Sequence, residues 1–406
     1  MNVPSSNTDT KRGGRGLSIL LGVVLLGVVA AAIALGRGVI PGIGGASGAG
    51  GIGGVGSSAD GASQVAQKPG LTQLRGVIGS EKRGYFEDPD VVARLEELGY
   101  QVSFSTAGSR EIATGIDIEA QDFVFPSSAP AAQKVREQGS GYSVDFPFFS
   151  PMAVASWQPI TEILEGEGVV TKDGDNYVLD MAKFVDLASS GARWRDFGDT
   201  FASPRTVQIR STDIRTSNSA AMYLAILNYE FQQRDPARGD DVNYLVESIS
   251  PFFTGQGYSE SSSSGPFAEY LAQGIGAAPM VMVYEAQYLG EQMSPNSRIR
   301  DDMVLLQLHP TVLANHGIVG VSAGGKELGK LLTNDPQLQQ LAARHGFRPA
   351  TSGSLAQELE SQGFEPPRDY VNSIDPPNYD RLEQLIDGVG TRYGKIAPPP
   401  KNGEEE

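Results

Sequence analysis

The chain has 406 residues, 40% of them hydrophobic, which is enough for one large domain or for two lobes with their own cores. It contains no cysteine, which excludes a disulfide framework, a thiolate metal site and a lipid-modified cysteine near the N-terminus. The net charge of −16 argues against a general affinity for nucleic acid, and 3 scattered histidines do not indicate a metal site.

The first 36 residues contain an apolar run from Leu17 to Gly36. It has 20 residues and no charge, which is long enough for a helix that spans a bilayer. Lys11, Arg12 and Arg15 precede this run, and only Arg37 follows it closely. The positive-inside rule therefore places the N-terminal segment, residues 1–16, in the cytoplasm and the rest of the chain outside. We expect a single-pass membrane protein with an extracytoplasmic domain.

A cleaved signal peptide is the competing interpretation of the same run. Ala32-Ile33-Ala34 has the small-x-small pattern of a cleavage site, and cleavage would release a secreted protein. The apolar run is longer than the roughly 7–15 residues of a typical signal sequence, which favours an uncleaved anchor at 17–36. Both interpretations export the main body of the chain.

Two flanking segments have compositions that cannot form a core. Residues 36–70 include 13 glycines and almost no charge, so we expect residues 37–70 to form a flexible linker. Residues 393–406 are Pro-rich and then acidic, and we expect them to be disordered. The folded domain is therefore expected over residues 71–392.

Strand and helix signals alternate through this domain. Asp88 can cap a helix that begins at Pro89, and Gly99 can end it. Such alternation predicts an α/β fold with a parallel sheet and helices on both faces. The predicted strands cover 74–80, 101–106, part of 122–130, 206–210, part of 279–289 and 303–310, with a long extended segment over 144–156.

Polar loops follow several of these strands, which is where ligands bind in parallel sheets. Each loop also admits the simpler interpretation of ordinary turn or cap chemistry. The candidates are Gly108, Ser109 and Arg110 after the second strand, Ser127 and Ser128 after the third, and Ser211 to Ser219 before a later helix.

The loop over 211–219 has more polar residues than a helix cap requires. Unpaired amides at a helix N-terminus favour a small polar or anionic group. Arg215, like Arg110, could bind an anion, or could be solvated or salt-bridged. Asp213 would instead repel an anion or orient Arg215. The ligand candidates in this loop are Thr212, Asp213, Arg215, Ser217, Asn218 and Ser219.

The buried strand within 279–289 is predicted to end at Tyr284 and Glu285. Tyr284 could offer its hydroxyl or its ring to a ligand, and Glu285 could contact a cationic group or close the lobes through a salt bridge. A run of 4 serines, 261–264, has the simpler interpretation of a loop with a helix cap.

No enzyme signature stands out. The sequence shows no Walker-type loop and no dinucleotide fingerprint after the first strand. His309 is predicted at a strand end, His316 in a turn and His345 at a helix end. We therefore expect a protein that is not an enzyme, with no catalytic residue, no metal and no cofactor.

Four segments carry a resemblance to a known family: residues 76–113, FPSSAP at 125–130, STDIRTSNSAAMYLAIL at 211–227, and PFAEYLAQGIGAAPMVMVYEAQYL at 266–289. They resemble bacterial extracellular solute-binding proteins, and within them a membrane-anchored subgroup of substrate-binding-domain proteins. The likeness implies the two-lobed type 2 periplasmic-binding fold with a hinge. It also implies that the AGS, PSS and TSNS loops correspond to the loops that contact oxyanions in phosphate- and molybdate-type binding proteins. Ser217-Asn218-Ser219 departs from the Ser-Gly-Thr of the phosphate pattern.

The family fold implies that the chain crosses between the lobes twice, near 150–156 and near 303–310. The first lobe would then comprise residues 71–152 and 303–392, and the second lobe residues 153–302. Two functions from different classes fit this layout. The first is capture of a small polar or anionic solute for a transporter, such as an ABC permease, or for a sensor. The second is a ligand-independent adaptor in an envelope complex.

Overall fold

The computed structural model describes residues 68–256, 262–350, 354–367 and 372–393. The expected membrane anchor, almost all of the glycine-rich linker and almost all of the acidic tail lie outside these residues. Within them, no helix combines the length and the apolar character needed to cross a membrane. Lys68 already belongs to the folded part, because its backbone N–H donates to Oε1 of Gln101 at 2.9 Å.

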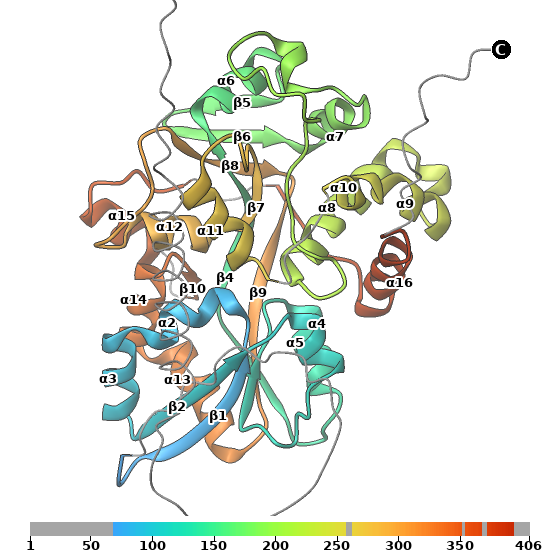
Figure 1. Ribbon diagram of the computed structural model, residues 1–406. Helices are drawn as coiled ribbons and strands as arrows, with labels where there is room; N and C mark the ends of the chain where they lie inside the picture. Colours follow the sequence, from blue (N-terminus) through green and yellow to red (C-terminus); the bar gives the residue numbers. More distant parts are fainter. Residues whose placement is uncertain (1–67, 257–261, 351–353, 368–371, 394–406) are drawn as a thin grey trace, which may run out of the picture. The chain divides into compact units, whose positions relative to one another are not determined.

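The first lobe is built on a sheet with the strand order β2-β1-β3-β9-β4 (Figure 1). β1 pairs in parallel with β2 and β3, whereas β9 is antiparallel to β3 and β4. The strands of this lobe are β1 (Thr72–Ile78), β2 (Tyr100–Thr106), β3 (Phe123–Phe125), β4 (Ser143–Trp157), β9 (Thr311–Gly320), β10 (Arg348–Pro349) and β11 (Ser373–Ile374). Its helices are η1 (Ser80–Lys82), α2 (Arg83–Glu87), α3 (Pro89–Glu97), α4 (Ser109–Thr114), α5 (Ala129–Arg136), α13 (Ala323–Asn334), α14 (Pro336–Arg344) and α15 (Ser354–Ser361).

Helices cover both faces of this sheet, because alternate strand residues point to opposite sides. Phe123 and Phe125 of β3 pack into one apolar cluster, and Val124 between them packs into a second cluster on the other face. α3 begins as the sequence predicts. The Asp88 side chain accepts the backbone N–H of Asp90 at 2.9 Å.

The second lobe contains the strands β5, β6, β8, the second half of β4, and β7. Their bounds are Val170–Asp173 for β5, Asn176–Asp180 for β6, Val281–Tyr284 for β7 and Met303–His309 for β8. The helices are α6 (Gln158–Gly166), α7 (Met181–Ser189), η2 (Trp194–Phe197), α8 (Asn218–Arg234), η3 (Pro236–Arg238), α9 (Val242–Ile249), α10 (Pro251–Thr254), α11 (Ser264–Gln273), α12 (Glu285–Gln292) and α16 (Tyr379–Gly390).

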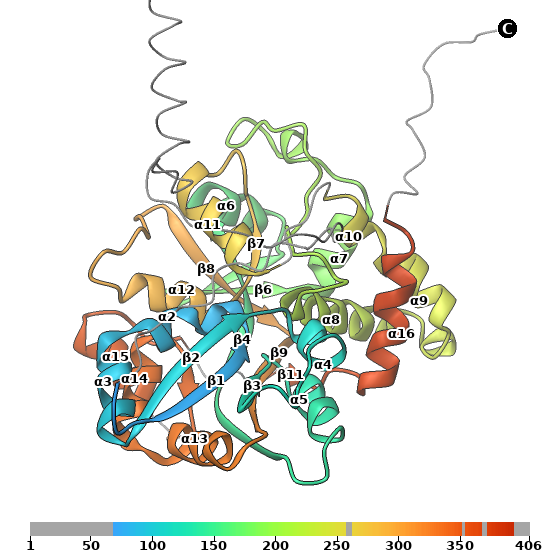
Figure 2. The ribbon, with the colours of Figure 1, turned by 60° about the horizontal axis from the view of Figure 1, so that its bottom comes forward.

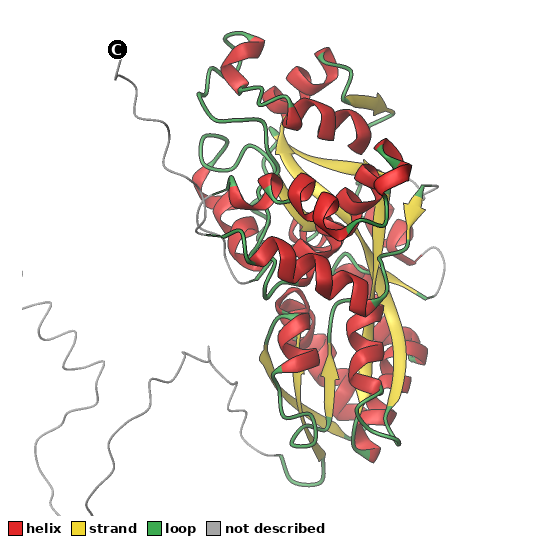
Figure 3. Ribbon diagram, turned by 90° about the vertical axis from the view of Figure 1, so that its right-hand side faces the viewer, coloured by secondary structure: helices red, strands yellow, loops and turns green. Residues whose placement is uncertain are grey.

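Two strand segments run through both lobes (Figure 3). β4 pairs with β9 as far as Pro151, and from Met152 onward it pairs with β7 and β8. β8 ends at His309 and β9 begins at Thr311, so the return passage lies beside the first one. These shared strands connect the two lobes.

The C-terminal helix α16 contacts both lobes. It packs on α9 and α8 of the second lobe and on α5 of the first (Figure 2). The boundary predicted from sequence places these residues in the first lobe, and that boundary stays a prediction. The position of the helix matters for the charged residues described below.

Two local predictions were wrong. Residues 206–210 form no strand. Only isolated bridges join Arg193 to Thr206 and Arg210 to Val281, because this segment runs at the edge of the second sheet. His316 is not in a turn. It lies inside β9 opposite Phe148, fully buried, since pairing with β4 overrides the turn preference of Asn-His-Gly.

Candidate functional site

The predicted polar loops meet between the two lobes around a small cavity of about 20 Å³. Each loop begins at the end of a strand or at the start of a helix, as the sequence predicts. The residues that line the cavity are Gly79, Ser80, Glu81, Ala107, Gly108, Ser109, Ser127, Ser217, Asn218, Ser262, Ser263 and Tyr284. The structure therefore brings together six of the predicted ligand residues from four separate segments.

Asn218, the first residue of α8, bonds to both lobes. Its Nδ2 donates to the carbonyl oxygen of Ser127 in the first lobe at 3.2 Å and to the Tyr284 hydroxyl in the second at 2.9 Å. The backbone N–H of Ser127 in turn donates to Oγ of Ser109 at 2.9 Å. The polar groups of the cleft thus satisfy one another, and the described residues hold the lobes closed.

Two glycines mark close approaches beside the cavity, Gly108 between the lobes and Gly79 within the first lobe. A Cβ on Gly108 would lie 2.0 Å from the carbonyl oxygen of Thr216, across the cleft. A Cβ on Gly79 would lie 2.3 Å from Oγ of Ser127. Since backbone atoms cannot move aside as a long side chain can, Gly108 marks a point where only a glycine permits full closure.

The hydroxyls before α8 do not act as a simple helix cap. Ser217 is the N-cap residue, but its side chain accepts no hydrogen bond from the first turn. Its Oγ lies 3.1 Å from Oγ of Ser219, which lies 2.9 Å from Oγ1 of Thr212. Ser217 lines the cavity, whereas Thr212 and Ser219 lie behind it and fix its position.

A buried charged cluster, which the sequence analysis missed, lies beside the cavity. Glu81 and Lys82 follow β1 directly and form an ion pair in which the two side chains are 4% and 0% exposed. Lys82 Nζ also donates to Oγ of Ser127 at 3.0 Å and lies 3.1 Å from Nδ1 of His316. Nδ1 of His316 is 3.3 Å from Oε1 of Glu81.

The charge states of this cluster follow from burial and mutual attraction. Burial raises the pKa of Glu81, but Lys82 and His316 outweigh this effect and hold that pKa well below its usual range. Burial, together with the charge of Lys82, lowers the pKa of His316 to about 4. Burial also lowers the pKa of Lys82, and the Glu81 carboxylate opposes this effect, so at neutral pH the cluster holds a carboxylate and a neutral imidazole beside Lys82.

Glu81 presents one oxygen that the cluster does not use. Its hydrogen bonds among the described residues come from Lys82 and Ser127 and go to Oε1, the oxygen that also lies 3.3 Å from Nδ1 of His316, and none goes to Oε2. Glu81 also lines the cavity. The cleft therefore offers a carboxylate acceptor alongside hydroxyl and amide groups.

The predicted arginines are paired with acidic groups. Arg110 contacts Glu383 and Asp387 of α16, both at 2.7 Å, and donates to the carbonyl oxygen of Arg215 at 3.2 Å. Arg215 forms an ion pair with Asp213 at 2.5 Å. Of the two interpretations offered for these arginines, the structure shows the salt-bridged one.

The remaining predicted residues take structural positions. Glu285 is fully buried and pairs with Arg348 of β10 at 2.7 Å, which matches the salt-bridge interpretation rather than a ligand contact. Ser128 lines a second cavity of about 20 Å³ that it shares with Arg110 and residues of α16. The cleft cavity is not lined by Glu285, Asp213 or Arg215.

The signal for the missed residues was present in part. Gly79-Ser80-Glu81-Lys82 follows the first strand, so the rule that places ligands at strand ends applies to it as it does to the later loops. His316 carried no comparable signal, because its neighbours Asn315 and Gly317 are typical of a turn.

Comparisons with solved structures identify the fold. A periplasmic thiamin-binding protein is 12% identical and superposes with a TM-score of 0.53, over 80% of this chain and 97% of that one. The sulfate-binding protein SubI from Mycobacterium tuberculosis H37Rv is 14% identical, with a TM-score of 0.48 over 77% and 96% of the two chains. The periplasmic molybdate-binding protein of Azotobacter vinelandii is 12% identical, with a TM-score of 0.41 over 68% and 100%.

Comparisons of the sequence with family models and with curated proteins find no match. The likeness to the thiamin-binding protein rests on structure, and it shows the fold alone. The described part of the chain has the two-lobed α/β fold of periplasmic solute-binding proteins.

Proposed function

We propose that the protein captures a small polar solute in the cleft between its lobes, outside the cytoplasmic membrane. The observation that carries the proposal is the double contact of Asn218 with Ser127 and Tyr284. These groups come from both lobes and bond to one another when the lobes are closed. On opening, the same groups become available to a solute.

The solute is expected to enter by movement of the lobes. A cavity of about 20 Å³ is far smaller than the roughly 300–1,000 Å³ of typical ligand sites. Turning about β4 and the β8–β9 connection would separate Ser127 from Asn218 and enlarge the cavity. The tether expected from the sequence would keep this domain near a permease or a sensor in the membrane.

The charges of the cleft favour a solute that donates hydrogen bonds over a bare oxyanion. Lys82 is neutralised by Glu81, and Oε2 of Glu81 is an acceptor that would repel an anion. Arg110 and Arg215 already have acidic partners. A polyhydroxylated or amine-bearing solute fits these groups, and the anionic alternative expected from the loop resemblance fits them less well.

The test is thermal denaturation of the purified full-length protein with neutral sugars, amino acids, and inorganic sulfate and phosphate. A solute at 100 times its dissociation constant is expected to add about 2.7 kcal/mol of stability. Asn218→Ala should abolish this gain, whereas Asn334→Ala, at an exposed position in α13, should retain it.

Two results would overturn the proposal. One is that no probe stabilises the protein while a single envelope protein co-purifies with it in fixed ratio, which is the behaviour of an adaptor. The other is that a stabilising probe acts equally on the wild type and on Asn218→Ala, which would place its site outside the cleft.

A further inference from the structure

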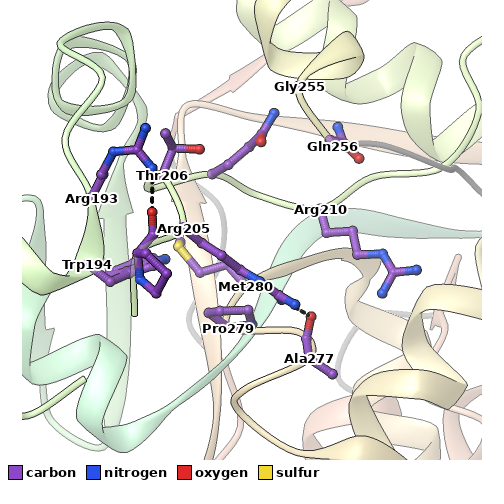
Figure 4. Close-up of a pocket in the computed structure, with 12 residues that line it drawn as sticks. Arg193, Trp194, Arg205, Thr206, Arg210, Gly255, Gln256, Ala277, Pro279 and Met280 are labelled. Carbon is purple, nitrogen blue, oxygen red and sulfur yellow. Dashed lines mark hydrogen bonds between the residues drawn. The ribbon is translucent and has the colours of Figure 1, made fainter. Parts of the chain in front are cut away.

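A cavity formed by described residues lies away from the cleft, within the second lobe. It has a volume of about 710 Å³ and shares no lining residue with the cleft cavity (Figure 4). Its walls come from the segment after α7, from the end of α10 and from the residues before β7. The lining residues are Arg193, Trp194, Pro204, Arg205, Thr206, Gln208, Arg210, Gly255, Gln256, Ala277, Pro279 and Met280.

The chain around this cavity is held in place by backbone hydrogen bonds. The N–H of Trp194 donates to the carbonyl oxygen of Arg205 at 3.1 Å, and the N–H of Val207 donates to that of Ala192 at 2.8 Å. Arg193 and Thr206 form a β-bridge. The backbones of Arg193 and Arg205, both of which line the cavity, are therefore fixed beside it.

The charge of the cavity is opposite to that of the chain. The chain carries −16, yet no aspartate or glutamate is among the residues that line the cavity, and three of them are arginines. Arg210 forms an ion pair with Glu269 of α11, and Figure 4 shows its guanidinium turned away from Arg193 and Arg205. The positive charge of the cavity is thus concentrated on the other two arginines.

Arg193 and Arg205 lack acidic partners among the described residues. Arg193 donates to the carbonyl oxygen of Pro204 at 2.5 Å, and Arg205 donates to that of Ala277 at 2.9 Å. The carboxylate of Asp196 accepts a hydrogen bond from the backbone N–H of Arg193 at 2.8 Å. This contact does not involve the guanidinium group of Arg193. Each guanidinium has five N–H donors, so most of them remain available.

We infer that this cavity is a second ligand site, which binds a small organic molecule carrying phosphoryl or sulfo groups. Guanidinium groups match such oxyanions through paired hydrogen bonds. The volume exceeds what a lone oxyanion needs and falls within the range of small-molecule sites. The amide groups of Gln208 and Gln256 and the hydroxyl of Thr206 provide polar contacts for the rest of the molecule.

The test is calorimetric titration of the full-length protein with pyrophosphate, glucose 6-phosphate and glucose 6-sulfate, with glucose as the uncharged control. We expect saturable binding of at least one charged probe that depends on Arg193 and Arg205, whereas any binding of glucose should not depend on them. The affinities for glucose 6-phosphate and glucose 6-sulfate show whether the site prefers a phosphoryl or a sulfo group.

Matched variants locate the site. Arg193→Gln with Arg205→Gln should weaken binding about tenfold or more, since charge-assisted hydrogen bonds are lost. Arg136→Gln with Arg392→Gln removes the same charge at two exposed arginines outside the cavity and should change affinity less than about twofold. Thr206→Val serves as a second cavity variant that keeps both charges.

Three results would overturn the inference. No saturable binding of any charged probe would show that the cavity holds no such ligand. Equal losses in the two double variants would show that net charge, not the cavity, drives binding. Loss of binding in Asn218→Ala would place the probe in the cleft, and it would then bear on the proposed function instead.

Discussion

Nζ of Lys82 lies 3.1 Å from Nδ1 of His316, and neither side chain is exposed to solvent. The two residues are far apart in sequence, one after β1 and the other inside β9. Glu81 contacts both of them and supplies the compensating charge. A titratable cluster is thereby built next to the surface on which the lobes close.

The first prediction concerns acid stability. The pKa of His316 is lowered to about 4, so between about pH 6.5 and pH 4 the unfolded chain binds a proton at this residue and the folded chain does not. The contribution of His316 to the free energy of unfolding is therefore complete above pH 6.5, and it is lost as the pH falls toward 4. The loss should amount to about 3 kcal/mol, measurable by urea denaturation across this range.

His316→Gln should flatten this dependence, because the titrating group is gone. His309→Gln, at the exposed end of β8, should leave the dependence unchanged. His345, whose pKa is also lowered by burial, adds a loss of the same sign in all three proteins. Equal slopes in the wild type and His316→Gln would contradict the prediction.

The second prediction concerns the ion pair of the same cluster. Lys82→Met leaves the Glu81 carboxylate buried without its cation, which should cost about 3–5 kcal/mol of unfolding free energy. Adding Glu81→Gln removes the unpaired charge and should restore much of this loss. Lys330→Met breaks an exposed pair with Glu327 and should cost less than about 1 kcal/mol. Failure of the double variant to recover stability would show that packing, not charge, causes the loss.

The third prediction tests the close approach at Gly108. A methyl group there would meet the Thr216 carbonyl oxygen, so Gly108→Ala should hold the lobes apart. The radius of gyration from small-angle scattering should increase. Gly276→Ala, where a Cβ meets no atom within 4 Å, should scatter as the wild type does. An unchanged radius for Gly108→Ala would mean that the lobes do not close at this point.

Sequence reasoning was most successful where structure is local. The cap at Asp88, the start of α3 at Pro89 and the strands before Gly108 and Ser127 depend on neighbouring residues, and the structure confirms them. His316 and the segment 206–210 were predicted wrongly because distant strands decide their conformation. The same limit applies to the arginines, because α16 supplies the partners of Arg110 from far along the chain.

The cavity of Arg193 and Arg205 illustrates a different limit. These arginines are separated in sequence by residues 194–204, and the pairing of Arg193 with Thr206 brings their segments together at one cavity. Neither periodicity nor a motif encodes that pairing. The candidate cleft was predictable because it lies at strand ends, whereas this cavity was not.

The fourth prediction concerns the contact between Arg110 and α16. Arg110 lies in α4 of the first lobe and bonds to Glu383, to Asp387 and to the Arg215 carbonyl oxygen of the second lobe. Arg110→Gln should therefore speed local opening of the cleft, seen as faster amide hydrogen exchange in residues 215–221. The loss of global stability should be only about 1 kcal/mol, because the side chains are partly exposed.

Arg238→Gln is the matched control for this contact. It breaks a pair with Asp235 only three residues away, within the second lobe, at 2.7 Å. Exchange in residues 215–221 should then stay at the wild-type rate. A double-mutant cycle of Arg110→Gln with Glu383→Gln should show a coupling energy. Once Arg110 is replaced, Glu383 has lost its ion pair, so Glu383→Gln should cost less in that background than in the wild type. Strictly additive effects would mean that the ion pair of Arg110 with Glu383 contributes nothing to closure.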